Sequence, residues 1–185
     1  KKQKEKDIKM KECFKRGFSI VRRPTGGRAV LHADELTYSI VVKKRENYNV
    51  HNIYRDIHIF LLESLRNLGC NDIDFEKSQA DFKTLYKESS FSVSCFASSA
   101  RYEISWNNKK IVGSAQRLFG DVLLQHGSIL LDKGHGQLAY ITKTKTKESQ
   151  RNLLNYIENH SATLSQATGR KISFVECAEA IKKNI

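Results

Sequence analysis

Two segments of this chain set glycines and other small residues beside fixed positive charge. The first covers residues 22–32 and reads RRPTGGRAVLH, and the second covers residues 109–116 and reads KKIVGSAQ. Backbone without bulky side chains can lie close to an acyl or phosphate group, and neighbouring cations can bind the negative charge of such a ligand. Cys95 lies between the two segments, and a thiol beside a cation loses its proton more easily and becomes a nucleophile. The combination points to acyl-transfer chemistry.

The pair Gly26-Gly27 forms the centre of the first segment. Two glycines between strands can make a tight turn whose N–H groups face a ligand, with Arg23 nearby to hold negative charge. The spacing matches neither the G-x-G-x-x-G dinucleotide motif nor the G-x-x-x-x-G-K phosphate loop. A purely structural turn with surface arginines is the alternative, and the local pattern alone favours it.

Lys110 and Cys95 are the candidates for the chemical step. Lys110 opens a strand-like run that continues into Gly113 and Ser114, so its ammonium could approach a carbonyl oxygen as a point charge. An ordinary hairpin lysine beside Lys109 is the alternative. For Cys95 the alternative is a buried, inert thiol, because the sequence does not show whether a cation lies beside it.

Histidines are the remaining candidates for proton transfer. His126 stands in a Gln-His-Gly-Ser stretch and could act as a general base. A structural role is the commoner one for a lone histidine. No convincing chemical context surrounds the histidines at positions 51, 58, 135 and 160.

Length and composition describe a single basic domain. The chain has 185 residues, enough for one domain with a substantial core, and 39% of them are hydrophobic, as in soluble globular proteins. No apolar run is long enough to cross a membrane, and no apolar stretch follows the N-terminal lysines as in a secretory signal. We therefore expect a cytoplasmic protein. The net charge of +12 calls for an acidic partner, which could be nucleic acid or an acidic carrier protein.

The four cysteines are Cys13, Cys70, Cys95 and Cys177, far apart in the sequence. They form no C-x-x-C pair and no cysteine–histidine cluster at zinc spacing, so we expect neither a metal site nor a disulfide framework. Free thiols are the expectation. Cys13 and Cys177 lie in helical patterns that are typical of buried structural residues.

Apolar periodicity predicts both helices and strands. Spacings of three and four residues predict helices over residues 5–16, 50–68 and 148–160 and from Ser173 onward, the last with an S-x-x-E capping box. Alternating patterns predict strands over residues 18–22, 29–31, 36–43, 73–75, 100–106, 109–115 and 122–131, with a two-residue turn at Asn107-Asn108. Residues 76–90 are expected to form a loop. These elements predict one α+β (mixed α/β) domain over residues 1–185, with a mixed, largely antiparallel sheet flanked by helices.

Five blocks of residues, in this order along the chain, resemble the biotin/lipoate protein ligase and lipoyl-transferase family. The blocks are residues 22–32, 35–39, 95–96, 110–116 and 124–128. The resemblance covers nearly the whole chain. It implies the fold of the biotin/lipoate ligase catalytic domain.

Within that family, the chain is most similar to the cysteine-dependent octanoyltransferase branch. Residues 95–98 match the position of the acyl-carrying cysteine of those enzymes. Residues 34–37 read DELT where many ATP-using lipoate ligases have Gly-Asn. The chain also ends at a helix, without the accessory domain often found in lipoate ligases.

The resemblance implies a role for each matched residue. Cys95 would carry the octanoyl group as a thioester, and Lys110 would hold the substrate carbonyl oxygen and favour the thiolate. The acyl pocket would be lined by Arg23, Gly26, Gly27, His32, Gly113, Ser114, Gln116, His126 and Gly127. No metal or other cofactor is implied for this branch.

The implied activity is octanoyl transfer from acyl carrier protein, through the cysteine thioester, to a lysine of a lipoyl domain in protein lipoylation. The acceptors would be the lipoyl domains of glycine cleavage H protein or of 2-oxoacid dehydrogenases. The protein would act as a monomer, with neither nucleic acid nor membrane as a partner. The alternatives are an ATP-dependent lipoate-protein ligase, which would need ATP and magnesium, and a lipoyl-domain amidotransferase.

Two further alternatives stay open. The positive charge would also suit a basic nucleic-acid-binding module, although the aromatic residues fit helix and strand cores in place of a stacking platform. The chain also begins inside the family pattern, without the early strand and helix that members usually carry, so the domain is N-terminally truncated relative to the family. A catalytically idle member of the family is therefore the other alternative.

Overall fold

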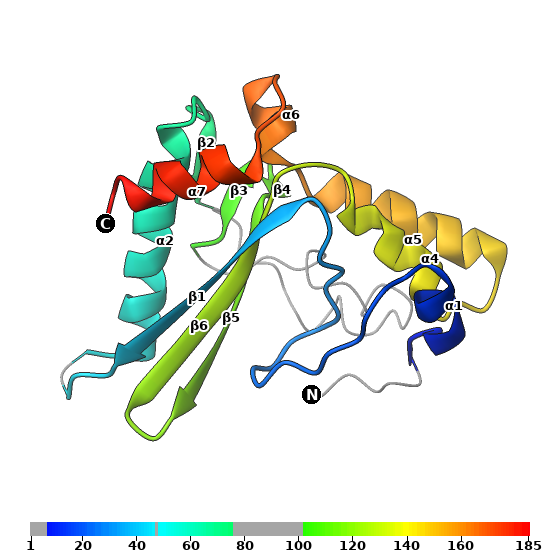
Figure 1. Ribbon diagram of the computed structural model, residues 1–185, viewed down its shortest axis with the longest axis horizontal. Helices are drawn as coiled ribbons and strands as arrows, with labels where there is room; N and C mark the ends of the chain where they lie inside the picture. Colours follow the sequence, from blue (N-terminus) through cyan, green and yellow to red (C-terminus); the bar gives the residue numbers. More distant parts are fainter. Residues whose placement is uncertain (1–6, 47, 76–101) are drawn as a thin grey trace.

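The computed structural model describes residues 7–46, 48–75 and 102–185 (Figure 1). Cys95 and the loop expected over residues 76–90 therefore lie outside the described residues. Within the described ranges, the strands form two antiparallel sheets of three strands each. The larger sheet has the order β1-β6-β5, made of β1 (Glu35–Lys43), β6 (Val122–Leu130) and β5 (Val112–Phe119).

The smaller sheet has the order β2-β3-β4, and it is continuous with the larger one along the chain. It contains β2 (Ile73–Phe75), β3 (Ile104–Trp106) and β4 (Lys109–Lys110). Ile111 is the link between β4 and β5, and its side chain is buried. Its N–H donates to the carbonyl of Ile104 at 2.9 Å and its carbonyl accepts from Leu130 N at 3.1 Å, so one residue belongs to both hydrogen-bonding systems.

A two-residue turn closes the β3–β4 hairpin. Asn107 and Asn108 have φ angles of 49° and 58°, and Trp106 pairs with Lys109 across the turn. Asparagine tolerates this left-handed backbone better than most residues, and two such residues match the twist of the flanking strands. The predicted turn is confirmed.

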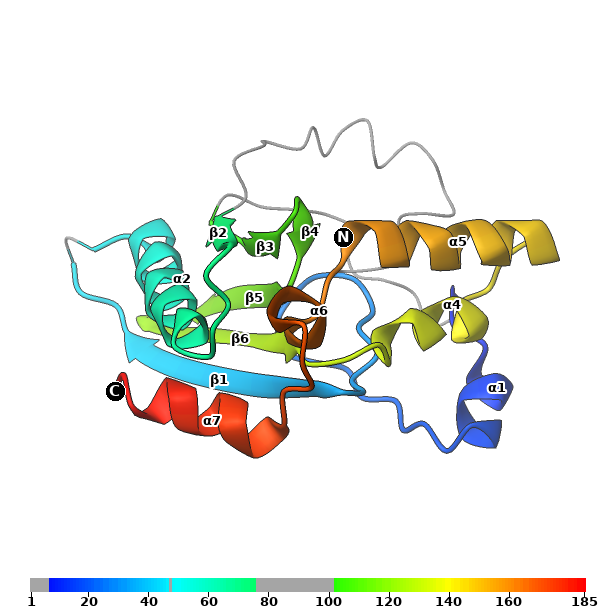
Figure 2. The same ribbon diagram turned by 90° about the horizontal axis from the view of Figure 1, so that it is seen from above.

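Helices surround the strands in two groups. One group contains α2 (Val50–Arg66), α6 (Leu164–Thr168) and α7 (Phe174–Lys182), with α7 alongside β1 and in contact with α2. Figure 2 shows α2 and α7 at one end of the molecule and α6 near its middle. The other group contains α1 (Met10–Lys15), the 3₁₀ helix η4 (His135–Gln137), α4 (Leu138–Ile141) and α5 (Lys147–His160).

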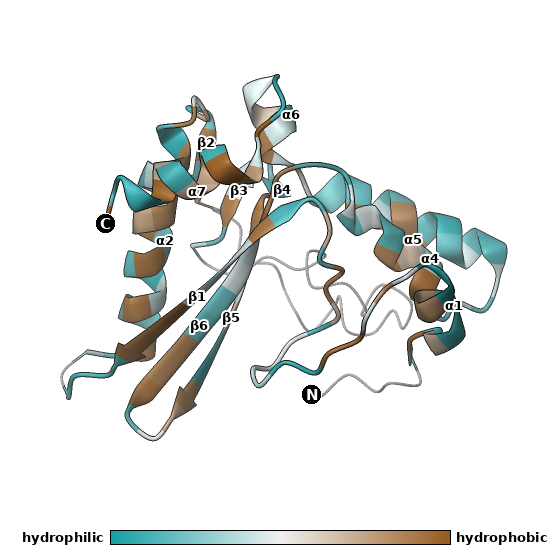
Figure 3. Cartoon of the chain, in the orientation of Figure 1, coloured by the Kyte–Doolittle hydropathy of each residue, from teal (hydrophilic) through white to brown (hydrophobic). Residues whose placement is uncertain are grey.

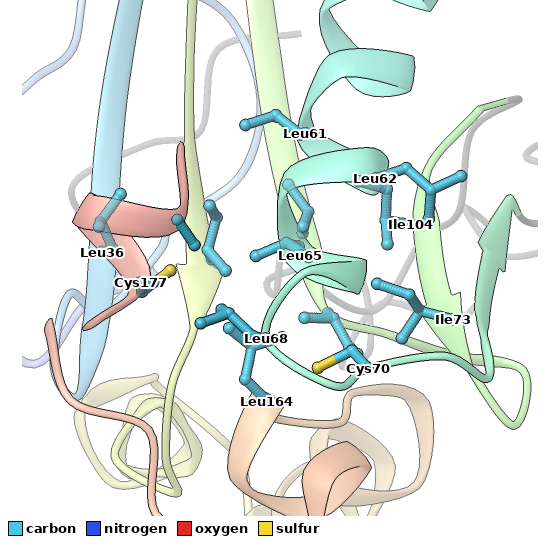
Figure 4. Packing of buried hydrophobic residues seen from close by; sticks show 14 of the residues in the cluster. Leu36, Leu61, Leu62, Leu65, Leu68, Cys70, Ile73, Ile104, Leu164 and Cys177 are labelled. Atoms are coloured by element: carbon cyan, nitrogen blue, oxygen red, sulfur yellow. The ribbon is translucent and has the colours of Figure 1, made fainter. Parts of the chain in front are cut away.

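The main apolar core lies between α2, α7 and the strands (Figure 4). On α2, Ile53, Ile57, Leu61 and Leu65 recur every four residues, so one face of the helix is buried. Leu65 is 0% exposed and points into the cluster together with its neighbours in other elements. The larger set visible in the figure includes Leu36, Leu68, Cys70, Ile73, Ile104, Leu164 and Cys177.

A second cluster joins α1, α4 and α5. Its buried members are Cys13, Leu31, Leu138, Ala139, Ile141, Leu153 and Ile157. Only Leu153 and Ile157 are buried on α5, and Figure 3 shows most of that helix as hydrophilic. The glycine-rich segment reaches this cluster through Leu31, which ties that segment to the second group of helices.

Most predicted elements are confirmed, with changed ends. The helix predicted over residues 50–68 is α2, and those over 148–160 and from Ser173 are α5 and α7. Strand predictions over residues 36–43, 73–75, 109–115 and 122–131 are confirmed as well. The helix over 5–16 shortens to α1, and the strand over 100–106 shortens to β3. The α+β class is confirmed, with two small sheets in place of one.

Two strand predictions are wrong. Neither residues 18–22 nor residues 29–31 form a strand. Val21 is 87% exposed and Ile20 is 41% exposed, so the apolar residues that suggested a strand have no sheet face to pack on. Between the two segments, Arg23 Nη2 donates to the carbonyl of Arg28 at 2.9 Å, so a side chain bridges the loop that joins them.

Helix α6 was missed, although its N-terminus carries a readable signal. Thr163 accepts from the N–H of Gln166, and the Gln166 side chain accepts from the N–H of Thr163, which is a complete capping box. At α7, Ser173 accepts from the N–H of Glu176 as predicted, while the Glu176 carboxylate accepts from Arg170.

No helix among the described residues is long and apolar enough to cross a membrane, and the cytoplasmic location stays a prediction.

We expect Leu65→Ala to lower the free energy of unfolding by about 2 to 5 kcal/mol, because it leaves a cavity in a fully packed core. Ile59→Ala is the matched control, since Ile59 lies on the same helix, loses as many carbon atoms and is 37% exposed. Urea denaturation of both variants checks the difference. Equal losses would contradict the core position of Leu65.

Candidate functional site

The segment 22–32 meets strands β1, β5 and β6 around a cavity of about 430 Å³. A cavity of this size accommodates a small organic group. It is lined by Arg23, Val30, His32, Thr37, Tyr38, Gly113, Ser114, His126, Gly127 and Ser128. Residues 22–32 and residues 109–116, the two segments singled out in the sequence, therefore both contribute side chains or backbone to the lining of one cavity.

The cavity has room because two paired positions of the sheet, Gly127 and Ser114, carry a small side chain or none. Gly127 of β6 pairs with Tyr38 of β1 on one side and with Ser114 of β5 on the other. A Cβ atom at Gly127 would lie 2.6 Å from the carbonyl oxygen of Gly113 and 2.7 Å from Cε1 of Tyr38. Any other residue would have to push the strands or the tyrosine ring aside, so this position requires glycine.

Two contacts fasten the glycine-rich loop to the sheet. Thr25 Oγ1 lies 2.5 Å from His126 Nε2 on β6, and Arg117 Nη1 of β5 donates to the carbonyl of Pro24 at 2.6 Å. Gly27 has a φ of 108°, which strains residues other than glycine, so it is required by the turn. Gly26 and Gly27 do not line the cavity, whereas Arg23 does.

His32 stands at the cavity with a buried carboxylate behind it. Its Nδ1 contacts Glu35 Oε1, and Ser128 Oγ donates to the same carboxylate oxygen at 2.8 Å. The His32 side chain is 59% exposed, while that of Glu35 is 3% exposed. The hydrogen bond that His32 donates to Glu35 raises the pKa of His32, against the opposing effects of partial burial and of the charge on Arg23.

His126 faces the same cavity in a different electrostatic setting. Partial burial lowers its pKa, and the positive charges of Arg23 and His32 lower it further. The two histidines of the cavity are therefore shifted in opposite directions, since only His32 has a carboxylate partner.

A row of partly buried hydrogen bonds runs beneath the cavity. Ser114 Oγ lies 2.6 Å from the Tyr38 hydroxyl and 2.9 Å from His58 Nε2. Gln125 Nε2 donates to the same tyrosine oxygen at 3.1 Å, and Gln116 Nε2 donates to Gln125 Oε1 at 2.7 Å. Gln116 thus joins this hydrogen-bonded row and is absent from the cavity lining.

His58 had no chemical context in the sequence, yet it supports the cavity floor from α2. Its ring is 0% exposed and stacks on Tyr54 with 4.2 Å between ring centroids. Burial lowers its pKa to about 4, with a smaller effect from the charge on Lys110. Its place on the buried face of α2, one residue after Ile57, is the signal that could have revealed it.

Lys110 lies inside the protein and pairs with a carboxylate that the sequence analysis missed. Its Nζ is 2.5 Å from Glu103 Oε1, and the two side chains are 5% and 6% exposed. The two-residue turn places Ser105 opposite Lys110, and Glu103 is two residues further along the same strand face. That register could have predicted the pair. Lys110 does not line the cavity, and its distance to Cys95 involves residues that the structure does not describe.

Metal binding is not apparent in the part of the chain that the structure describes. No group of three or more histidine, cysteine, aspartate or glutamate side chains is placed there to hold an ion. The three described cysteines, Cys13, Cys70 and Cys177, are free and buried. The described lining of the cavity offers histidine, arginine, hydroxyl and backbone groups.

The whole chain, residues 1–185, matches the family model for the lipoyl protein ligase A/B catalytic domain. The chain belongs to this family. Among curated relatives, this catalytic domain is 35% identical over 181 residues to octanoyltransferase LipM of Brevibacillus brevis, covering 96% of the chain and 65% of that protein. It is 34% identical over 184 residues to octanoyltransferase LipM of Clostridioides difficile, covering 98% of the chain and 65% of that protein.

Solved structures show the same fold. The lipoyl protein ligase A/B catalytic domain described above superposes on a bipartite lipoate protein ligase from Thermoplasma acidophilum with a TM-score of 0.74 at 19% identity, over 98% of this chain and 62% of the other. A lipoate-protein ligase A bound with ATP gives a TM-score of 0.68 at 20% identity, over 97% and 62% of the two chains. At such identities the likeness concerns the fold.

Breaking the Glu103–Lys110 pair should destabilise this catalytic domain. We expect Glu103→Gln to lower the free energy of unfolding by about 3 to 5 kcal/mol, because it leaves a buried ammonium without its carboxylate. Urea denaturation of Glu103→Gln, Lys110→Met and the double variant measures the coupling. The double variant should lose less than the sum of the single losses, and strict additivity would contradict the pair. Glu179→Gln, which breaks an exposed pair with Lys182, should change little.

The buried His58 predicts a specific pH dependence of stability. Between pH 6.5 and 4 the unfolded chain protonates this histidine while the folded protein does not, so stability falls as the pH falls through that window. At pH 4 the wild type should have lost about 3 kcal/mol more than His58→Gln, each relative to its own value at pH 7. Urea denaturation at a series of pH values gives the stability of each protein. If the stability of the wild type and that of His58→Gln changed with pH in parallel, the buried, uncharged state of the ring would be contradicted. His126 and His135 also have lowered pKa values, but both histidines are present in the wild type and in His58→Gln, so their contributions cancel in the comparison.

Proposed function

We propose that this chain is the catalytic domain of an octanoyltransferase of protein lipoylation. It would take an octanoyl group from acyl carrier protein onto Cys95 as a thioester. It would then pass the group to a lysine of a lipoyl domain, with the cavity beside His32 and His126 receiving the acyl group or the arriving lysine.

The observation that carries this proposal is the 35% identity to octanoyltransferase LipM over 181 residues, nearly the whole chain. The chain spans 65% of the length of that relative, so the activity of the complete enzyme is itself part of the proposal. The cavity supports it further, because six residues expected at an acyl pocket line one space: Arg23, His32, Gly113, Ser114, His126 and Gly127.

Bond energies favour this route without a nucleotide. Transfer from a carrier thioester to Cys95 exchanges one thioester for another and is close to thermoneutral. Transfer to a lysine amine forms a more stable amide, so the second step makes the overall reaction favourable. A ligase that starts from the free acid must first activate it with ATP.

The other three thiols are poor candidates for the acyl-carrying group. Burial raises the pKa of Cys70 to about 11 and that of Cys177 to about 12. Burial also raises the pKa of Cys13, which is 1% exposed. A thiol held in its protonated form is a weak nucleophile, which supports Cys95 as the proposed acyl-carrying residue.

The charge of the chain suits the proposed partners. Its net charge is +12. Carrier proteins and lipoyl domains are acidic, so opposite charge would speed their encounter with this protein. Association that slows as salt is added would agree with this role.

The test is to mix the protein with octanoylated acyl carrier protein and a lipoyl domain, without ATP, and to follow intact masses. We expect one octanoyl adduct on the enzyme that hydroxylamine removes, followed by an octanoyl group on the lipoyl domain. Cys95→Ser should lose the adduct and reduce transfer by about a thousandfold or more.

Cys13→Ala is the matched control for loss of a thiol, because Cys13 belongs to the second apolar cluster. It should keep the adduct. Full activity of Cys95→Ser would overturn the covalent route, and strict ATP dependence with free octanoate or lipoate as donor would identify a ligase.

A further inference from the structure

His32 holds an imidazole ring at the cavity, with its Nδ1 engaged by neighbouring side chains. Within the described ranges, its recorded hydrogen bonds all involve Nδ1, which contacts Glu35 Oε1 and lies 3.3 Å from Ser128 Oγ. The ring lines the cavity and its side chain is 59% exposed. Nε2 is therefore the nitrogen that a group entering the cavity can reach.

Glu35 is a carboxylate in an unusual setting. Its side chain is 3% exposed, and Oε1 receives both the Ser128 hydroxyl and the contact with His32. In the described part of the chain, the other oxygen, Oε2, is buried without a hydrogen-bond partner. A buried carboxylate with so little solvation is stabilised by a neighbouring cation, so it favours the protonated state of His32.

Amide formation from a thioester poses a proton problem that this arrangement can solve. A lysine side chain has a pKa of about 10.4 and enters the site as an ammonium, which has no lone pair for attack. A base must remove one proton before the nitrogen can reach the carbonyl carbon. A histidine whose basicity is increased by a carboxylate, with its free nitrogen in the cavity, is suited to this step.

We propose that His32 is the general base that takes a proton from the acceptor ammonium through Nε2, and that Glu35 is the positioning residue that orients the ring. The inference rests on the proposed function for the nature of the acyl donor. It adds the identity of the group that activates the acceptor.

The atoms of the step balance as follows. Nε2 takes the first proton from the ammonium, and the freed amine attacks the thioester carbonyl carbon. The new C–N bond forms as the C–S bond breaks, and the departing sulfur, that of Cys95 in the proposed function, takes the second proton from the nitrogen. His32 then returns its proton to water.

The other basic groups near the cavity are less suited to this role. His126 Nε2 lies 2.5 Å from Thr25 Oγ1, and burial lowers the pKa of His126. Lys110 is paired with Glu103 and does not line the cavity. Besides Glu35 and His126, Arg23 is the charged side chain that faces His32, and its charge opposes protonation of the ring.

The test separates the two half-reactions in single-turnover experiments. His32→Gln should accept the octanoyl group from acyl carrier protein at the wild-type rate. Its transfer of that group to the lipoyl domain should fall by about 100-fold or more. Hydroxylamine is already uncharged at neutral pH, so it should remove the octanoyl group from His32→Gln as fast as from the wild type. A merely structural role for His32 would slow that reaction as well.

The pH dependence of lipoyl-domain acylation tests Glu35. The wild-type rate should rise with pH through the raised pKa of His32, because the base must be unprotonated. Glu35→Gln should move this rise to lower pH and reduce the rate above it. His51→Gln is the control for His32→Gln, because it makes the same chemical change at an exposed residue of α2. It should leave both half-reactions unchanged.

The outcomes distinguish this inference from the proposed function. Transfer by His32→Gln within about threefold of the wild type, or an unmoved pH profile in Glu35→Gln, would overturn the role of the pair. A wild type that acylates the lipoyl domain without a thioester on itself would overturn the covalent route, and the rates of His32→Gln would still decide the role of the base. A wild type that transfers nothing would overturn both.

Discussion

Close contact between three strands at Gly127 is the constraint on which the cavity depends. The glycine pairs with Tyr38 and Ser114 in neighbouring strands, and its missing side chain lets the tyrosine ring and the Gly113 carbonyl occupy the same small region. The resulting hollow is closed by the loop of residues 22–32, which hydrogen bonds to β5 and β6 hold in place. A side chain at this one position would disturb the floor and the walls together.

Charged and polar groups are divided between the interior and the cavity. Below the surface, Lys110 and Glu103 neutralise each other, and His58 stays uncharged beside Ser114. At the cavity, Arg23 and His32 keep contact with water or with a ligand. This division lets the interior carry polar groups with partners, while the groups that can exchange protons with a substrate lie at the accessible side.

Much of the fold could be predicted from local pattern. The four-residue repeat of α2 and the Asn107-Asn108 turn depend on neighbouring residues, and both were predicted correctly. The apolar stretch of residues 18–22 was misread as a strand, because Ile20 and Val21 are exposed and no strand among the described residues pairs with it. Glu103 was missed for a related reason, since its meaning appears only when hairpin register sets it beside Lys110.

The amino-acid sequence by itself determined the family, the α+β class and six of the ten residues around the cavity, since these follow from periodicity and from the ordered blocks. Tertiary structure alone decided which of those residues share one space. It placed His32 in contact with Glu35 and paired Lys110 with the carboxylate of Glu103. It also placed Gln116 in a hydrogen bond with Gln125, away from the cavity lining. The physical reason is that hydrogen-bond partners and desolvation depend on distances between residues far apart in the chain, which neither spacing nor residue type records.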